Sequence, residues 1–178
     1  MFSVREIQAP DIEPITNYWL NSDDAFLTSM GVDLKKMPSR EQWHQMLASQ
    51  LTQAYTEKQS YCTIWEINGQ AVGHCNINKI KFGEEAYLHL HLWQPNDRQK
   101  GVGTTFVKMS LPYFFTNLQL KRLYSEPYSL NPGPNKTLEK VGFQLLQTMV
   151  TTPGWLNFEQ EVNLWALNLE EFEAMQKV

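Results

Sequence analysis

Hydrophobic positions recur at helical spacing in two segments near the N-terminus, after a short alternating strand pattern in residues 2–7. One helix is expected behind Asp11, with an apolar side formed by Ile12, Ile15, Tyr18 and Trp19. A second helix is expected from Ser39 to about Lys58, because Gln42 completes a capping box with Ser39. Its apolar side comprises Trp43, Met46, Leu47, Leu51, Ala54 and Tyr55.

Three strand patterns follow in the middle of the chain and predict an antiparallel meander. SYCTIWEI and QAVGHCNINKI are separated by the hairpin dipeptide Asn68-Gly69, and AYLHLHLW comes after Phe82-Gly83. The third pattern is followed by RQKGVGT, and an apolar helical pattern then runs to about Thr116.

The C-terminal part predicts a strand in KRLYSEPYSL, a short helix in PNKTLEKVGF that ends at Gly142, and a hairpin of residues 143–150 with residues 158–167. Residues 21–38 have mixed polarity and are expected to form a loop or a broken helix. This order of elements predicts an α/β (α+β) fold with a mixed sheet. A chain of 178 residues can bury one substantial core, so we expect a single domain over residues 1–178.

Composition and charge exclude several functional classes. The formal charge of −4 and the pI of about 5.6 disfavour nucleic acid as a partner, because phosphate neutralisation needs a basic surface. Cys62 and Cys75 lack the spacing of a zinc site, so no metal is expected, and a reduced, cytoplasmic protein fits best. No segment approaches the ~18 apolar residues of a membrane span, and no signal peptide is apparent, so no membrane partner is expected.

The stretch RQKGVGT predicts an anion-binding site. A strand, a glycine-containing loop and a helix start bring free backbone N–H groups together, and the helix dipole favours negative charge there. A Walker loop would need a Lys-Ser or Lys-Thr pair after a glycine, and none is present. A dinucleotide fingerprint would need a third glycine where Phe106 stands. Both of these phosphate-binding motifs are therefore excluded.

Two motifs in register resemble those of the GNAT acetyltransferase superfamily. The first is the pattern [RQ]xxGx[GA], which Arg98, Gly101 and Gly103 satisfy. The second runs from Asn131 to Phe143, an asparagine followed eleven residues later by Gly-Phe. The resemblance covers roughly residues 60–145.

This resemblance implies a mostly antiparallel sheet, flanked by helices, in which the fourth and fifth strands splay apart and acetyl-CoA binds as the acyl donor. The pantetheine arm of acetyl-CoA would pair with the backbone of His91, Leu92 and Trp93. The pyrophosphate would be held by the amides of Arg98, Gln99, Lys100, Gly101, Val102, Gly103 and Thr104. Asn131 matches a family asparagine near the pantetheine end. Pro134 stands where the family has serine or alanine, and a proline is compatible with the first turn of a helix.

His89 and Glu126 are the candidate catalytic residues. A lysine-like amine has a pKa of about 10.4, so a general base is needed near pH 7. Alternation along YLHLHLW places His89 and His91 on the face opposite the leucines, and Glu126 follows the fifth strand. We expect His89 to be the base and Glu126 to be its partner or the amine-binding carboxylate. Alternatively, the two histidines cover a half-exposed sheet face and Glu126 is solvated.

A narrower likeness concerns the residues after the fifth strand. Glu126-Pro127, Asn131 and the later Gly-Phe are similar to the GNAT branch that acylates N-hydroxylysine-type amines in siderophore synthesis, although Leu138 stands where that branch has a tyrosine. The ribosomal-protein-modifying branch is an alternative. Tyr124 and Tyr128 are near in sequence and are candidates for the acid that protonates the departing thiolate, but the sequence places neither hydroxyl.

Together these features predict an acetyl-CoA-dependent N-acyltransferase. A primary amine or hydroxylamine of a small molecule would attack the thioester directly, with no metal and no covalent enzyme intermediate. Two alternatives remain open, namely acetylation of protein N-termini or lysines, and acyl-CoA binding without turnover. The expected partner is a small-molecule amine, and homodimer formation is left open.

Overall fold

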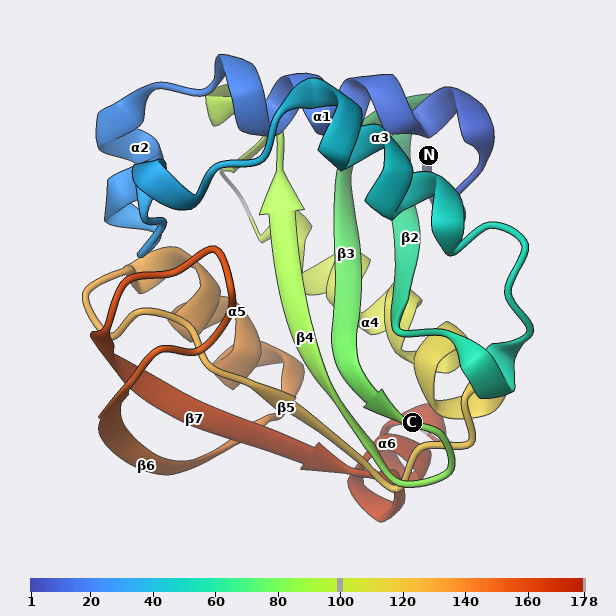
Figure 1. The fold of residues 1–178 in the computed structure, drawn as a ribbon. Coiled ribbons are helices and arrows are strands. Elements are labelled where there is room, and N and C mark those ends of the chain that lie inside the picture. Colours follow the sequence, from blue (N-terminus) through green and yellow to red (C-terminus); the bar gives the residue numbers. More distant parts are fainter. Residues whose placement is uncertain (99–100, 178) are drawn as a thin grey trace.

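Seven strands form one sheet in the computed structural model, which describes residues 1–98 and 101–177 (Figure 1). The strands are β1 (Phe2–Glu6), β2 (Ser60–Ile67), β3 (Gln70–Lys81), β4 (Glu85–Leu92), β5 (Arg122–Ser125), β6 (Gln144–Thr151) and β7 (Gln160–Asn168). Their order in the sheet is β1-β2-β3-β4-β5-β7-β6. Neighbouring strands are antiparallel except for β4 and β5, which are parallel. The predicted mostly antiparallel mixed sheet is confirmed.

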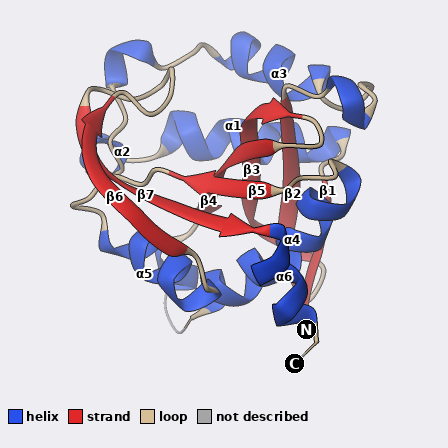
Figure 2. Ribbon diagram, turned by 90° about the horizontal axis from the view of Figure 1, so that it is seen from below, coloured by secondary structure: helices blue, strands red, loops and turns tan. Residues whose placement is uncertain are grey.

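Helices cover both faces of this sheet, as Figure 2 shows. They are α1 (Ile12–Asn21), α2 (Asp24–Ser29), α3 (Arg40–Ser49), α4 (Val102–Asn117), α5 (Pro132–Val141) and α6 (Leu169–Gln176). One hydrophobic cluster joins α4, α5 and α6 to the sheet, with Trp65 stacked on Phe106 at its centre. A second cluster joins α1, α2 and α3 to the opposite face, around Ile15 and Ile64. No helix in the described part of the chain is both long and apolar enough to cross a membrane.

Local sequence signals explain most helix and turn boundaries. The capping box of Ser39 and Gln42 is present at the start of α3. Gly142 ends α5 with a φ of +117°, a left-handed value that favours glycine. The predicted hairpin turn at Asn68-Gly69 has positive φ at both residues, which suits the twist of the flanking strands.

The predicted end of the second helix near Lys58 is wrong. The helix α3 ends at Ser49, because its last turn tightens into a bond from the Leu51 N–H to the Ala48 carbonyl, and the Lys58 ammonium then donates to the Gln50 carbonyl. Within residues 21–38, Asp23 caps the short helix α2 by accepting from two backbone N–H groups. The sequence analysis did not predict α6, which follows β7 directly.

The parallel pair β4 and β5 is short, and this opens the sheet. Pairing joins only Glu85–Tyr87 to Arg122–Tyr124, and the Ser125 hydroxyl then donates to the Leu88 carbonyl at 2.7 Å. Pro127 has no N–H to extend the ladder. The two strands meet near the β3–β4 turn and separate toward their other ends, which confirms the predicted splay (Figure 1).

Candidate active site

The unpaired part of β4 directs backbone groups into the gap. In a strand, the N–H and C=O of one residue face the same side, and successive residues alternate. The Leu88 carbonyl accepts from Ser125 and the Leu92 carbonyl from Arg98, whereas the Trp93 N–H donates to Val72 in β3 at 2.9 Å. Leu88, Leu90 and Leu92 therefore present their backbone to the gap. The Trp93 N–H faces β3 while its carbonyl accepts from Arg98, and the pairing of residues 91–93 with the pantetheine arm stays a prediction.

The start of α4 fits the predicted anion cradle. Gly101 caps the helix with a φ of +76°, and a Cβ built there would meet nothing within 4 Å. A Cβ on Gly103 would lie 3.6 Å from the Thr137 hydroxyl and 4.0 Å from a Leu92 methyl group, between α5 and β4. The first N–H groups of a helix, here those of Val102, Gly103 and Thr104, have no partner inside it. Gln99 and Lys100, which were also assigned to this cradle, lie outside the described residues.

Arg98 uses its side chain to fasten the segment before the cradle. Its guanidinium donates to the carbonyls of Leu92 (3.1 Å) and Trp93 (3.4 Å), and its central carbon lies 3.9 Å from the centre of the Phe26 ring in α2. The side chain therefore links β4 to α2. The sequence analysis assigned the backbone amide of Arg98, not its side chain, to the pyrophosphate. That contact stays a prediction.

Asn131 begins α5, and its neighbour Asn135 holds this region in place. The Asn135 amide donates to the carbonyls of Tyr128 and Asn131 and accepts from Asn163 and from the Trp165 indole, all at 2.8–3.0 Å. These four bonds tie the segment after β5 to β7. Asn131 lines the cavity described below, and its predicted position near the pantetheine arm stays a prediction. The sequence analysis noted Asn135 only as the residue after Pro134 and missed this role.

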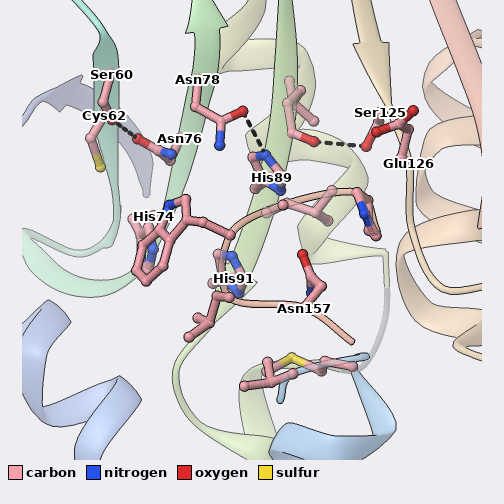
Figure 3. A pocket seen from close by; sticks show the side chains of 18 of the residues that line it. Ser60, Cys62, His74, Asn76, Asn78, His89, His91, Ser125, Glu126 and Asn157 are labelled. Carbon is pink, nitrogen blue, oxygen red and sulfur yellow. Dashed lines mark hydrogen bonds between the residues drawn. The ribbon is translucent and has the colours of Figure 1, made fainter. Parts of the chain in front are cut away.

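A cavity of about 440 Å³ opens between β4, β5 and the helices α1 and α3 (Figure 3). Both predicted catalytic residues, His89 and Glu126, line it. The His89 Nε2 atom lies 3.0 Å from Asn78 Oδ1, so Nε2 carries the proton and donates. Burial and the nearby Lys79 ammonium lower the pKa of His89 to about 4. The cavity volume is in the range of ordinary ligand pockets.

Two further histidines stand beside His89 on this face of the sheet. His74 and His91 stack with their ring centres 4.8 Å apart. The Trp93 indole donates to His74 Nδ1 at 2.8 Å, and the Tyr18 hydroxyl lies 3.1 Å from His91 Nδ1. Burial lowers the pKa of His74 to about 3 and the pKa of His91 well below 6.5. All three rings are therefore neutral near pH 7.

Glu126 faces the cavity from the other side of the gap. Its side chain is 10% exposed, and its Oε2 atom lies 3.6 Å from Lys79 Nζ. Burial raises the pKa of the Glu126 carboxyl above 4.5, and the ammonium of Lys79 opposes this shift. No hydrogen bond joins Glu126 to His89 among the described residues, so the predicted pairing of the two is not present in this arrangement.

Lys79 reaches Glu126 because β3 carries a bulge. The pairing of β3 with β4 shifts register between Asn78 and Lys81, and Lys79 adopts a φ of +48°, which is uncommon for a residue with a side chain. Its ammonium also donates to the Pro153 carbonyl at 2.6 Å. The side chain thus links β3, Glu126 and the loop between β6 and β7. The strand pattern gave no signal for this bulge.

The structure separates the two tyrosines named for thiolate protonation. Tyr124 stacks on Tyr87 at the paired ends of β5 and β4, 5.2 Å between ring centres. Tyr128 lines the cavity and packs edge-on against Phe158.

Cys62 also lines the cavity, and burial raises the pKa of its thiol, which disfavours a nucleophilic thiolate.

Comparisons with known proteins agree with this fold. Residues 2–144 match the family model described as an acetyltransferase (GNAT) domain. A spermidine N-acetyltransferase from Vibrio cholerae, in complex with CoA and spermine, has 17% identity and a TM-score of 0.77 over 97% of this chain and 98% of its own. An aminoglycoside acetyltransferase in complex with coenzyme A and kanamycin has 14% identity and a TM-score of 0.76 over 99% of each chain.

A third similar structure is RimL, a ribosomal alpha-N-protein acetyltransferase in complex with coenzyme A. It has 13% identity and a TM-score of 0.76, over 96% of this chain and 95% of its own. No curated protein matches in sequence. At these identities the three structures support the fold, and the family model supports the membership.

The protein belongs to the GNAT acetyltransferase family. It is an acetyl-CoA-dependent N-acyltransferase, and acetyl-CoA is its acyl donor.

Proposed function

We propose that the protein transfers the acetyl group of acetyl-CoA to a primary amine of a small molecule. The observation that carries this proposal is the position of Glu126, a mostly buried carboxylate that faces a cavity at the open part of the β4–β5 gap. A carboxylate at this point can hold a substrate ammonium group and accept its proton. The amine nitrogen then forms its bond to the acetyl carbon as the carbon–sulfur bond breaks.

The chain offers a matching set of groups for acetyl-CoA. The backbone of Leu90 and the N–H of Leu92 face the gap and can pair with the pantetheine arm, whereas the Leu92 carbonyl accepts from the Arg98 guanidinium. The first amides of α4 and the open space at Gly101 suit the pyrophosphate. Asn131 lines the cavity, and we assign it to the pantetheine end of the cofactor.

Glu126 is the better proton acceptor of the two candidates. A pKa of about 4 makes His89 a weak base, whereas burial raises the pKa of Glu126 above its ordinary value of 4.5. We therefore assign proton acceptance to Glu126, directly or through water, and assign His89 a neutral hydrogen-bonding role on the opposite wall. Tyr128 is the tyrosine near the cavity that remains for protonating the thiolate.

A thiol-release assay tests this function. Purified protein with acetyl-CoA should release CoA in the presence of small primary amines and should yield the N-acetyl amine by mass spectrometry. The panel should include lysine, N-hydroxylysine, polyamines, aminoglycosides and short peptides. Turnover restricted to peptides would replace the small-molecule acceptor with a protein N-terminus or lysine. Binding of acetyl-CoA without turnover of any amine would contradict the proposal.

Replacing Gly101 by alanine is expected to weaken acetyl-CoA binding about tenfold, or about 1.4 kcal/mol. The new methyl group would enter the open space before the first amides of α4 and keep the pyrophosphate away from them. Calorimetric titration with acetyl-CoA measures this effect.

Gly83 provides a matched control for that substitution. It has a φ of +75°, and a Cβ built there also meets nothing within 4 Å, but it lies in the turn between β3 and β4. Gly83→Ala and Gly101→Ala should each cost about 1 kcal/mol of stability, since both force a left-handed conformation. Equal acetyl-CoA affinity in the two variants would remove Gly101 from the binding site.

A further inference from the structure

Charge is scarce in the cavity that Glu126 faces. Among the described residues that line it, Lys79 and Glu126 carry the charge, and they lie 3.6 Å apart. The lining histidines His74, His89 and His91 are neutral near pH 7, because burial lowers the pKa of each ring. The cavity therefore offers a cationic ligand one carboxylate, and Lys79 already compensates part of its charge.

This charge distribution limits the number of ammonium groups that the acceptor can carry. Each ammonium group taken from water needs its own anionic or hydrogen-bonding partner. A polyamine or an aminoglycoside brings several such groups, and Glu126 can neutralise one of them, because the other polar side chains of the lining, apart from Lys79, are uncharged. An acceptor with a single amine therefore fits a cavity that offers one carboxylate.

Three indole rings also line the cavity. Trp19 of α1 and Trp43 of α3 stack with their ring centres 5.4 Å apart and an angle of 8°. Trp155, from the loop between β6 and β7, lies 5.8 Å from Trp43. Trp19 and Trp43 belong to the core, but Trp155 is 53% exposed at the cavity rim. An apolar or aromatic group placed against Trp155 would cover this surface.

The side chain of Lys79 connects Glu126 to the loop that carries Trp155. Lys79 lies beside Glu126 and also donates to the Pro153 carbonyl, in the loop that carries Trp155. The bulge in β3 therefore directs the Lys79 ammonium to both the Glu126 carboxylate and the loop between β6 and β7.

We propose that the acceptor is a monoamine that carries an aromatic or bulky apolar group. Its amine binds at Glu126 and its apolar group lies against Trp155 and the stacked indoles. This proposal rests on the proposed N-acetyltransferase function and names the acceptor class for the same site.

Matched amines test the acceptor class. With acetyl-CoA at pH 7.5, kcat/KM for 2-phenylethylamine and tryptamine should exceed that for ethylamine by about tenfold or more, since the added ring becomes buried. Spermidine and kanamycin should react more slowly than either aromatic amine. Faster acetylation of spermidine, kanamycin or a peptide would overturn the acceptor class and leave the transferase function intact. Binding of acetyl-CoA without acetylation of any amine would overturn both proposals.

A pair of variants separates binding at the rim from damage to the fold. Trp155→Ala should lower kcat/KM for 2-phenylethylamine about tenfold, mainly through a higher KM, and change the value for ethylamine less than about twofold. Leu146→Ala is the matched control, because Leu146 is 54% exposed on β6 and does not line the cavity. An equal loss for both amines in the Trp155 variant, or an equal loss in the two variants, would overturn the assigned role of Trp155.

Discussion

Replacing Glu126 by glutamine is expected to lower kcat/KM for the amine acceptor about 100-fold or more near pH 7, within the ~10²–10⁴ contributed by a general base. The acceptor amine is almost entirely protonated at this pH, and the amide of glutamine cannot take its proton. The substitution preserves the size of the side chain, so acetyl-CoA affinity should change little. Steady-state thiol release and calorimetry with acetyl-CoA measure the two quantities separately.

His89→Gln is the matched control for this experiment. Because His89 is a neutral ring that donates to Asn78, its replacement by an amide donor should cost less than about tenfold. The opposite ranking, with a small loss for Glu126→Gln and a large loss for His89→Gln, would restore His89 as the base.

The pH profile gives a second readout for the same carboxylate. The Lys79 ammonium lowers the pKa of Glu126, so Lys79→Met should raise this pKa and move the acidic limb of kcat/KM to higher pH. An unshifted acidic limb would show that the titrating group in the profile is not Glu126.

Local patterns in the sequence were sufficient to predict the strand and helix ends that frame this site. Alternation along β4 placed the leucines against the α4 core and the histidines on the cavity face, because the period of a strand is two wherever one face is buried. The helix start at Gly101 and the helix end at Gly142 were also predictable locally, since each depends on a few adjacent residues. Asn131 was assigned from the resemblance to the GNAT motif.

The features that complete the site depend on contacts between distant segments. The bulge at Lys79 breaks no rule of strand composition, and it is visible only from the pairing of β3 with β4. Asn135 has an evident role only once β7 lies beside α5. The low pKa of His89 follows from burial, so the sequence suggested an ordinary imidazole where the fold provides a weak base.

The protein is expected to lose stability steeply as the pH falls below about 6.5, through buried His74 and the half-buried His89 and His91. In the unfolded chain these rings bind protons below their ordinary pKa of 6.5, whereas in the folded protein the pKa is about 4 for His89 and about 3 for His74. Between these values the unfolded state binds more protons, so the free energy of unfolding decreases with falling pH. At 1.36 kcal/mol per unit, the shift of His74 alone corresponds to a loss of roughly 4–5 kcal/mol by about pH 3.

Urea unfolding at several pH values between 7.5 and 4 measures this loss, and His74→Gln isolates one contribution. Removing one of the three protonations should reduce the slope of unfolding free energy against pH by up to about 1.4 kcal/mol per unit. This change in slope is separate from any loss of stability that the variant shows at pH 7.5. His44→Gln controls for the removal of an exposed histidine and should leave most of the slope in place. A wild-type stability that stays flat from pH 6.5 to pH 4.5 would mean that these rings are hydrated and free to accept protons in the folded protein.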